Sequence, residues 1–470
     1  MRTRLLPCAL LSVLLLQACS DPVTKSRFAD AADWDVLVVV LDALPANHLG
    51  LYGYQPNGYP SPPISPEIAA FASGLGRHET LVFDEAHASA SYTLASTASL
   101  FTGASPATHG VLGLATNVLA KEHVTLAETL RSAGFATGAL SSNPNVSIEG
   151  QFDQGFDTFR HYFRDEFDLH TLPAHFVEDA GTWWRSEGAQ RRFLYAHLLP
   201  PHQPYDPPPP HSDLFGAGSV ERAEGLTPYL TELDRRTDLT ADSPEVERVR
   251  RRFDAGVHYA DALFGELLAN LGGPNGEGLA NTLIVLTSDH GEAFAQHGLL
   301  LHGGGVYEEL TRVPLVFGFP NGSLPETSQR TASLVSTTDL AATLCEILDL
   351  PWPGLAKGTS FLEPALAGES TERPVLSRSA GDRPLWSLRT DHFTFIEHGA
   401  TGTRQLFDRR TDPGELQDLA PSDPERTQKL AAKLESELEA ARRAGATFPR
   451  GSVPALIHKD ALEALGYFGD

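Results

Sequence analysis

The chain has 470 residues, of which 41% are hydrophobic and 20% are charged, and its formal net charge is −24. This apolar content suffices for a large core and excludes a broadly disordered chain. The acidic excess argues against nucleic acid as a partner, because a polyanion would be repelled wherever a metal or local cations do not reverse the field. Three cysteines are too few for a disulfide framework, so stability must come from burial of the core.

The first nineteen residues have the pattern of an export signal. Two arginines precede an apolar stretch from Leu5 to Leu16, which is too short to span a bilayer as a mature helix. The stretch ends in Leu-Gln-Ala-Cys19, which resembles the lipobox of bacterial lipoproteins. We therefore predict a signal peptide over 1–18, lipidation of Cys19 and a tether over 19–34. The protein would be exported and anchored by its lipid in the bacterial cell envelope, on the periplasmic face or in the outer membrane. An ordinary secretory signal is the alternative.

Runs of branched aliphatic residues predict the central sheet. Asp35–Leu41 (DVLVVVL) and Thr282–Thr287 (TLIVLT) have the composition of strands that are covered on both faces of a parallel sheet, and Phe193–His197 is a weaker third. Helical patterns lie between them, for example over His123–Gly134 and Phe253–Leu271. This alternation predicts an α/β fold with a mostly parallel sheet flanked by helices.

The chain divides into a predicted catalytic domain over 35–365 and a small α+β subdomain over 366–470. Within the first, residues 211–250 are acidic and polar, and they suggest an insertion or a lid. The subdomain is predicted to contain short antiparallel strands over 384–397 and 405–409, and a helix that starts at Pro424 with Ser422 or Asp423 as its cap and ends at Gly445.

Polar side chains follow two of the predicted strands. Asp42 comes directly after the first strand, and Asp289 and His290 come after the strand over 282–287. Because ligands gather at the carboxyl ends of parallel strands, these groups should converge. Two carboxylates and an imidazole make a plausible site for a divalent metal. Either aspartate taken alone could equally be a turn former or a helix cap.

A third element is the stretch Thr93–Gly103 (TLASTASLFTG), in which small and hydroxyl residues lead into an apolar run. The pattern is consistent with a nucleophile on a turn that opens a helix, where the helix dipole and a metal would both stabilise a developing anion. The alternative is a helix start whose hydroxyls cap backbone amides.

Together these stretches resemble the sulfatase-like branch of the alkaline phosphatase superfamily. The motifs follow family order through nearly the whole mature chain, and the ordered set is far more specific than any one member. The matching stretches are DVLVVVLDALPANHLGLYGY at 35–54, SYTLASTASLFTG at 91–103, SPATHGV at 105–111, NPNVSIEGQFDQGFDTF at 143–159, HLLPPHQPYDPP at 197–208, TSDHGEAFAQHG at 287–298, YEELTRVPLVF at 307–317, SLRTDHFTFIE at 387–397 and LFDRRTDPGELQDLA at 406–420. The resemblance implies an alkaline phosphatase-like central sheet, with a small C-terminal α+β subdomain.

The resemblance also implies a metal held by Asp42, Asp289 and His290 and touching a nucleophilic hydroxyl. Thr93, ten residues before Gly103, falls in the nucleophile position and would contact the metal. An imidazole ligand favours zinc or manganese over calcium.

Two further histidines are predicted to be catalytic from the resemblance: His202 falls where family members place a histidine that contacts the substrate anion or the leaving group, and His302 falls near a usual lysine or histidine. His202 lies in the PHxPY stretch, and His302 lies shortly before the Tyr-Glu-Glu triplet. The other motif histidines are predicted to be structural, namely His48, His109, His197 and His297. Arg312 is predicted to pair with Glu308 or Glu309.

The sequence departs from a true sulfatase at the nucleophile. Family sulfatases convert a Cys or Ser, followed closely by an Arg, into formylglycine, whereas Thr93 and Thr97 occupy these two positions here. Formylglycine is therefore not expected. Ala43 also replaces the second Asp of a pair that many sulfatases use as metal ligands. A single Asp with a Thr nucleophile and an Asp-His pair resembles the superfamily's phosphodiesterases, phosphonate hydrolases and phospho-group transferases.

We therefore predict a metal-dependent hydrolase that acts on a phosphodiester or phosphonate monoester through Thr93. Transfer of the phospho group to an acceptor other than water is a less favoured form of the same prediction. The substrate would be a small-molecule, glycan-derived or lipid-derived anionic ester, and the oligomeric state is left open. One alternative is a sulfuric ester hydrolase without formylglycine. The other is a non-catalytic surface-binding lipoprotein. The departures at Ala43 and Thr97 would favour it, and so would Pro45 and Asn47, which replace the Arg and Asp of the family's common DxLRADH pattern.

Overall fold

A computed structural model describes residues 28, 30–56, 63–74, 78–112, 118–162, 172–186, 188, 191–324, 328–353, 358–371 and 373–448. The predicted signal peptide and Cys19 lie outside these residues. The packed body includes Phe28 and Trp34, which both contact the ring of Phe319. Within the described ranges, none of the helices combines the length and the apolar character needed to cross a bilayer.

A mixed sheet of eight strands forms the centre, in the order β10-β2-β9-β6-β1-β5-β3-β4. Among these, β9 alone runs antiparallel to its neighbours. The strands are β1 (Asp35–Leu41), β2 (His78–His87), β3 (Ala136–Ser141), β4 (Thr158–His161), β5 (Arg192–Leu198), β6 (Thr282–Thr287), β9 (Leu315–Pro320) and β10 (Ser328–Ser336). The predicted fold class is confirmed, and so are the strands predicted over 35–41 and 282–287.

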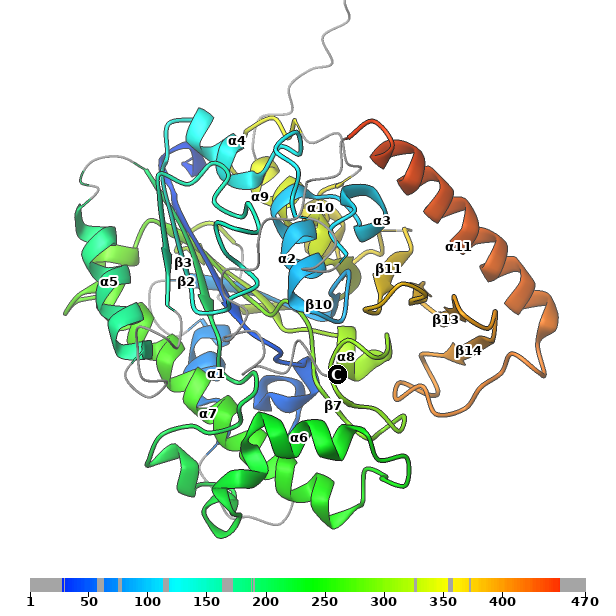
Figure 1. The fold of residues 1–470 in the computed structure, drawn as a ribbon. Coiled ribbons are helices and arrows are strands. Elements are labelled where there is room, and N and C mark those ends of the chain that lie inside the picture. Colours follow the sequence, from blue (N-terminus) through cyan, green and yellow to red (C-terminus); the bar gives the residue numbers. More distant parts are fainter. Residues whose placement is uncertain are drawn as a thin grey trace, which may run out of the picture.

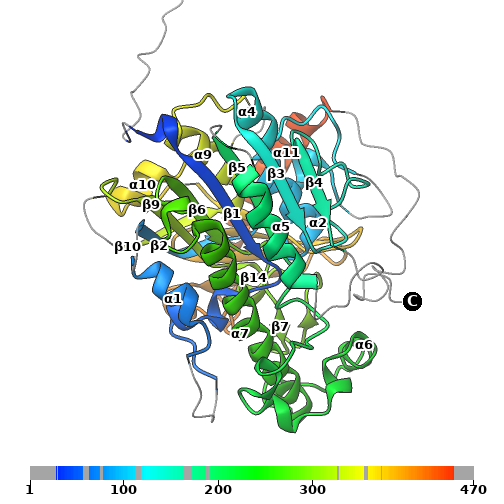
Figure 2. The same ribbon diagram turned by 90° about the vertical axis from the view of Figure 1, so that its left-hand side faces the viewer.

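Helices cover both faces of this sheet (Figure 2). Alternate residues of β1 enter two separate cores: Leu37 and Val39 face one, and Val36 and Val38 face the other. The first core is packed by α1 (Pro66–Ala72), α5 (Leu172–Ser186), α6 (Thr227–Asp234) and α7 (Pro244–Gly272). The second is packed by α2 (Thr93–Thr102), α4 (Leu126–Ser132), α9 (Leu340–Ile347) and α10 (Leu362–Ala367). Both faces are therefore buried at the centre of the sheet, which is why β1 and β6 are almost entirely apolar.

A smaller antiparallel sheet, which we call the C-terminal sheet, lies beside this body with one long helix against it (Figure 1). Its strands are β11 (Val375–Arg378), β12 (Leu385–Arg389), β13 (Phe393–His398) and β14 (Arg404–Asp408), and the helix is α11 (Pro424–Gly445). The predicted helix is confirmed at both ends, and its cap is Asp423, whose side chain accepts from the Arg426 amide at 3.1 Å. Strand β11 was not predicted.

The remaining elements are short and surround the ends of the central strands. They include α3 (Pro106–His109), β7 (Ala293–Phe294), β8 (Leu300–Leu301) and α8 (Glu308–Thr311). Two helices differ in length from their predictions: α4 spans 126–132 inside the predicted 123–134, because Thr125 caps it, and α7 starts at Pro244 rather than Phe253. The predicted insertion over 211–250 consists of 3-10 turns, α6 and the first turns of α7.

Candidate functional site

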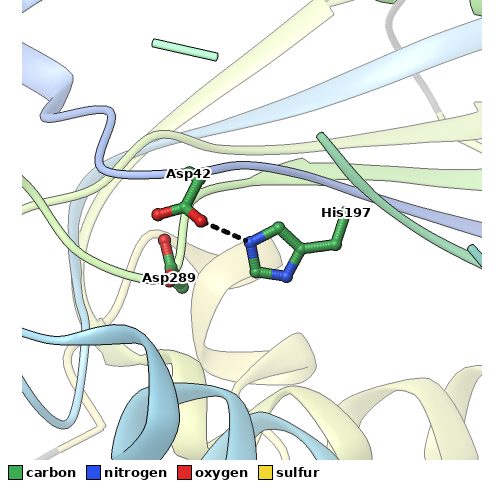
Figure 3. Close-up of side chains that lie close together, drawn as sticks. All are labelled: Asp42, His197 and Asp289. Carbon is green, nitrogen blue, oxygen red and sulfur yellow. Dashed lines mark hydrogen bonds and ion pairs between the residues drawn. The ribbon is translucent and has the colours of Figure 1, made fainter. Parts of the chain in front are cut away.

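The candidate site lies at the carboxyl ends of the three central strands. Asp42 follows β1, Asp289 follows β6 and His197 lies near the end of β5, and all three side chains are buried. Figure 3 shows the Asp42 carboxylate facing Asp289 and joined to His197. The strand order brings these ends together although the residues are far apart in the chain, as expected for parallel neighbours.

The backbone at the ends of β1 and β6 is held in tight turns. Ala43 has a φ of +57°, and its amide donates to Asp289 Oδ1 at 3.2 Å. Gly291 lies against the neighbouring segment, since a Cβ there would come within 2.1 Å of the Glu309 carbonyl oxygen. The turn after Asp42 and the close approach after His290 therefore fix the backbones that carry both carboxylates.

The donor set at this point fits a divalent metal. Ligand atoms of Asp42, His197 and Asp289 lie within 4.8 Å of one another. Asp42 Oδ1 and Asp289 Oδ2 are buried and have no hydrogen-bond partner among the described residues. Such oxygens are costly to bury, and a cation beside them would remove that cost. His290 Nε2 adds an imidazole, 3.7 Å from Asp42 Oδ1 and 3.5 Å from Asp289 Oδ2.

The other oxygen of Asp42 is fixed by two neighbours. Asn143 Nδ2 donates to Asp42 Oδ2, and His197 Nε2 lies 3.1 Å from the same oxygen. Burial raises the pKa of Asp42, but the charges of His202, His197 and His290 and the hydrogen bond from His197 outweigh it, so this pKa lies well below its ordinary value. Burial lowers the pKa of His197, but the hydrogen bond and the charge of the Asp42 carboxylate have the larger effect, so this pKa lies above its ordinary value. Asp42 is therefore held as an oriented carboxylate.

Thr93 is the first residue of α2 and its side chain is fully buried. Its Oγ1 lies 3.2 Å from His290 Nε2, and Asn143 Nδ2 donates to it at 3.4 Å. Asn143 thus binds both Thr93 and Asp42, which sets the hydroxyl beside the carboxylates. Because α2 starts at this residue, its first backbone amides also favour an anion bound there.

Three imidazole rings lie next to one another along the same side of the site. The ring centroids of His290 and His302 are 4.5 Å apart, and those of His302 and His202 are 4.8 Å apart. Glu292 lies behind them: its carboxylate is 3.1 Å from His302 Nδ1 and accepts from the Tyr205 hydroxyl at 2.8 Å. Burial lowers the pKa of His302, but the Glu292 carboxylate raises it above the ordinary value, whereas burial lowers the pKa of His202. His302 is therefore the more basic of the two.

The structure brings together all the residues that the sequence assigned to the site in the body of the chain. These are Asp42, Thr93, His202, Asp289, His290 and His302. Their catalytic and metal-binding roles stay predictions.

The motif histidines predicted to be structural divide into two groups. His48, His109 and His297 have partners elsewhere: their ring nitrogens contact Asp254 Oδ1 at 3.1 Å, Ser99 Oγ at 3.0 Å and Glu309 Oε1 at 2.8 Å, respectively. His197 instead belongs to the carboxylate cluster. The predicted pairing of Arg312 with Glu308 is confirmed at 2.8 Å.

The sequence reasoning missed His197, Asn143 and Glu292. Strand register carries the signal for His197, because it pairs with Val40, two residues before Asp42. Asn143 follows β3 by two residues, so the rule that found Asp42 would have found it once β3 was recognised. Glu292 lies two residues beyond His290 on the same turn and carried no separate signal.

Comparison with known proteins gives two family matches. The model described as Sulfatase matches residues 35–350, and the one described as N-sulphoglucosamine sulphohydrolase, C-terminal, matches residues 303–444. Among curated relatives, arylsulfatase K of Xenopus laevis is 26% identical over 302 residues, which cover 55% of this chain and 54% of the relative. The match to arylsulfatase K of Bos taurus is 30% identical and covers 41% of this chain and 37% of that protein. The chain thus spans about half or less of the curated relatives' length.

Solved structures share the fold over nearly their whole length. A protein solved in complex with its substrate D-glucosamine-2-N,6-O-disulfate has a TM-score of 0.70 at 16% identity, covering 87% of this chain and 98% of that chain. The phosphonate monoester hydrolase of Agrobacterium radiobacter has a TM-score of 0.67 at 20% identity, covering 87% and 96%. At these identities the likeness establishes the fold alone.

Proposed function

The chain belongs to the sulfatase family, and from that membership we propose that it is a metal-dependent hydrolase that cleaves a phosphodiester or phosphonate monoester with Thr93 as its nucleophile. The observation that carries the proposal is the buried Thr93 hydroxyl, 3.2 Å from His290 Nε2 and bonded to Asn143 beside the Asp42 carboxylate. An unmodified threonine with Thr97 in place of the arginine gives no route to formylglycine, and so favours phosphoryl over sulfuryl chemistry.

Asp42, Asp289, His290 and the Thr93 oxygen would hold the metal, with His197 as a further candidate. A bound divalent cation supplies Lewis-acid stabilisation of the anion and lowers the pKa of the hydroxyl. We favour zinc or manganese, because imidazole ligands suit them better than calcium. Asp42 is kept ionised by the surrounding histidines, so it is ready to bind a cation at neutral pH.

In the proposed reaction, the Thr93 hydroxyl gives up its proton to solvent, Thr93 Oγ attacks phosphorus, and the bond from phosphorus to the leaving oxygen breaks. That oxygen takes a proton from His302 or His202, whose rings lie side by side. Because Glu292 engages Nδ1 of His302, the proton would come from Nε2. Water, or an acceptor alcohol in a transferase, then attacks the phosphothreonine and gives its proton back to the same histidine. The bond from phosphorus to Thr93 Oγ breaks, and that oxygen takes up a proton from solvent to regenerate the hydroxyl.

The test is an initial-rate panel on the mature domain after chelation and addition of zinc, manganese or calcium. Nitrophenyl phosphate, bis-nitrophenyl phosphate, a nitrophenyl phosphonate and nitrophenyl sulfate are compared. We expect the diester or the phosphonate to lead. Thr93→Val keeps the side-chain shape without the hydroxyl and should lower kcat by roughly 10³-fold or more, whereas Thr93→Ser should retain turnover and form a covalent intermediate detectable by mass spectrometry. Wild-type turnover by Thr93→Val would exclude the mechanism.

Hydrolysis of a sulfate ester is the second candidate, and the family match is the observation that favours it. One structural neighbour is bound to a disulfated glucosamine, which supports an anionic ester on a sugar as a substrate class for either chemistry. Nitrophenyl sulfate leading the same panel would establish this candidate. Absence of turnover with every metal would instead favour the binding lipoprotein.

We further propose that the protein is exported and lipid-anchored through Cys19. The supporting observation is the Leu-Gln-Ala-Cys sequence after a short apolar stretch. Cys19→Ser should move the protein from the membrane fraction to the soluble fraction and abolish labelling by a fatty-acid probe. Unchanged membrane association of this variant would contradict the anchor.

A further inference from the structure

The C-terminal sheet, together with the segments that follow β11 and β14, touches the loop that carries His302. We define this loop as residues 297–309. Hydrogen bonds between them include Ala380 N to Gly303 O at 2.8 Å, Arg389 Nη2 to Val306 O at 2.7 Å, Tyr307 Oη to Gln405 Oε1 at 2.9 Å and Glu308 N to Glu415 Oε2 at 2.9 Å. Gly303 directly follows His302, so these bonds act on the backbone from which the imidazole projects.

Glu415 joins several of these contacts. Its side chain is 2% exposed, and its carboxylate accepts from Arg389 Nη2 at 3.3 Å as well as from the Glu308 amide. Its backbone carbonyl oxygen lies 2.9 Å from Nε2 of His297, at the other end of the loop. The φ of Glu415 is +55°, a conformation that persists in a non-glycine residue only when its surroundings hold it.

The Glu415–Arg389 pair is buried on both sides, because the Arg389 side chain is fully inaccessible. A buried pair of this kind is weak evidence for added stability, since desolvation offsets much of the attraction. The pair also forms backbone hydrogen bonds that a hydrophobic pair could not form. Arg389 donates to the Val306 carbonyl oxygen and Glu415 accepts from the Glu308 amide, and both of these groups belong to the 297–309 loop.

We propose that Glu415 is a positioning residue that fixes the backbone of the 297–309 loop, so that His302 faces the leaving group of the substrate. The imidazole would then be oriented from two directions: by Glu292 at Nδ1, and by the C-terminal sheet through the backbone. This inference rests on the proposed function, in which His302 donates a proton to the departing oxygen. It assigns the C-terminal sheet a part in catalysis without contact with the substrate.

Two variants test this role. Glu415→Gln keeps the shape and one acceptor but removes the charge that pairs with Arg389, and Tyr307→Phe removes one bond across the same boundary without burying a charge. The matched control is Glu397→Gln, since Glu397 pairs with Arg404 at 2.8 Å within the same sheet. In metal-loaded enzyme, Glu415→Gln should speed hydrogen exchange of the 303–308 amides about tenfold, and the control should not.

Catalysis provides the second readout. Glu415→Gln should lower kcat about tenfold with little change in KM, and in a His302→Ala background it should lower kcat no further. If Glu415→Gln lowered kcat by the same factor with and without the His302 imidazole, the role of Glu415 would be overturned. Unchanged hydrogen exchange of the 303–308 amides would overturn it as well. Wild-type turnover by His302→Ala would instead remove the proton donor of the proposed function, and the catalytic part of this inference with it. If Glu415→Gln does not fold, Tyr307→Phe decides, with an expected loss of about threefold in kcat and faster exchange.

Discussion

His109 is a buried histidine beside α2, the helix that starts at Thr93. Its Nδ1 accepts from the Val111 amide at 3.0 Å, which leaves Nε2 as the protonated nitrogen that donates to Ser99 Oγ at 3.0 Å. Burial, together with the charge of His123, lowers the pKa of His109 to about 3. The ring is therefore neutral in the folded protein at any pH near neutrality.

This lowered pKa predicts loss of stability in acid. Between pH 6.5 and about 3 the unfolded chain binds a proton at His109 that the folded chain does not, so the free energy of unfolding should fall as the pH decreases. The slope from one such group is at most about 1.4 kcal/mol per pH unit. His109→Gln should show a shallower decline between pH 6 and pH 4 in urea titrations. Parallel declines for the variant and the wild type would contradict the assignment.

A divalent cation should stabilise the fold through the two unpartnered carboxylate oxygens. A free metal concentration of 100 times Kd corresponds to about 2.7 kcal/mol, which thermal unfolding after chelation and zinc addition would detect. Asp289→Asn should lose most of that shift. Without metal the same variant should be at least as stable as the wild type, because it removes a buried charge close to Asp42. A full metal-induced shift in Asp289→Asn would exclude Asp289 as a ligand.

At the scale of elements, α11 stabilises the C-terminal sheet through one apolar stripe. Leu430, Leu434 and Leu438 lie on the buried side of the helix and pack with Leu388 and Phe395. Leu434→Ala should lower the free energy of unfolding by about 2–5 kcal/mol, because it leaves a cavity in this small core. The neighbouring Lys433 is exposed, and Lys433→Ala should change the same quantity by less than about 0.5 kcal/mol. Equal effects in chemical unfolding would contradict this packing.

Elements differed in how far the sequence could define them, for physical reasons. The strands β1 and β6 are buried on both faces, so their apolar runs gave both boundaries. The strand β11 has only four residues, two of them polar (VLSR), so no apolar run reveals it in the sequence. Residues 244–252 at the start of α7 were missed because they are rich in charge, although Pro244 and the spacing of Val246, Val249 and Phe253 are helical signals.

The same contrast holds within the site. Asp42, Asp289 and His290 could be placed because each follows a recognisable buried strand. Asn143 could not, since β3 (ATGALS) has a single branched aliphatic residue and not the run that marks such strands. The contacts of Glu415 with the 297–309 loop depend on how the C-terminal sheet packs against the main body, which no local pattern records.

At the scale of the whole molecule, the net negative charge of the chain would repel the anionic substrate that we propose for the site. The chain carries a net charge of −24, yet its proposed substrate is an anion. The described site gathers the imidazoles of His202, His290 and His302 along one side, beside the start of α2. Local cations, together with a bound metal, would therefore have to reverse the field over a short range.

The position of β1 in the sheet determines when this site can form during folding. One neighbour, β5, is separated from β1 by most of the N-terminal half, and the other, β6, brings Asp289 to Ala43 across 246 residues. Closure of so long a loop loses chain entropy before the contacts between its ends can stabilise the fold, so pairings of this kind form slowly. A ribosome must therefore release nearly two-thirds of the chain before Asp42 can meet Asp289. Until then the growing polypeptide cannot bring these two carboxylates together, and the proposed metal site forms only once the centre of the sheet has closed.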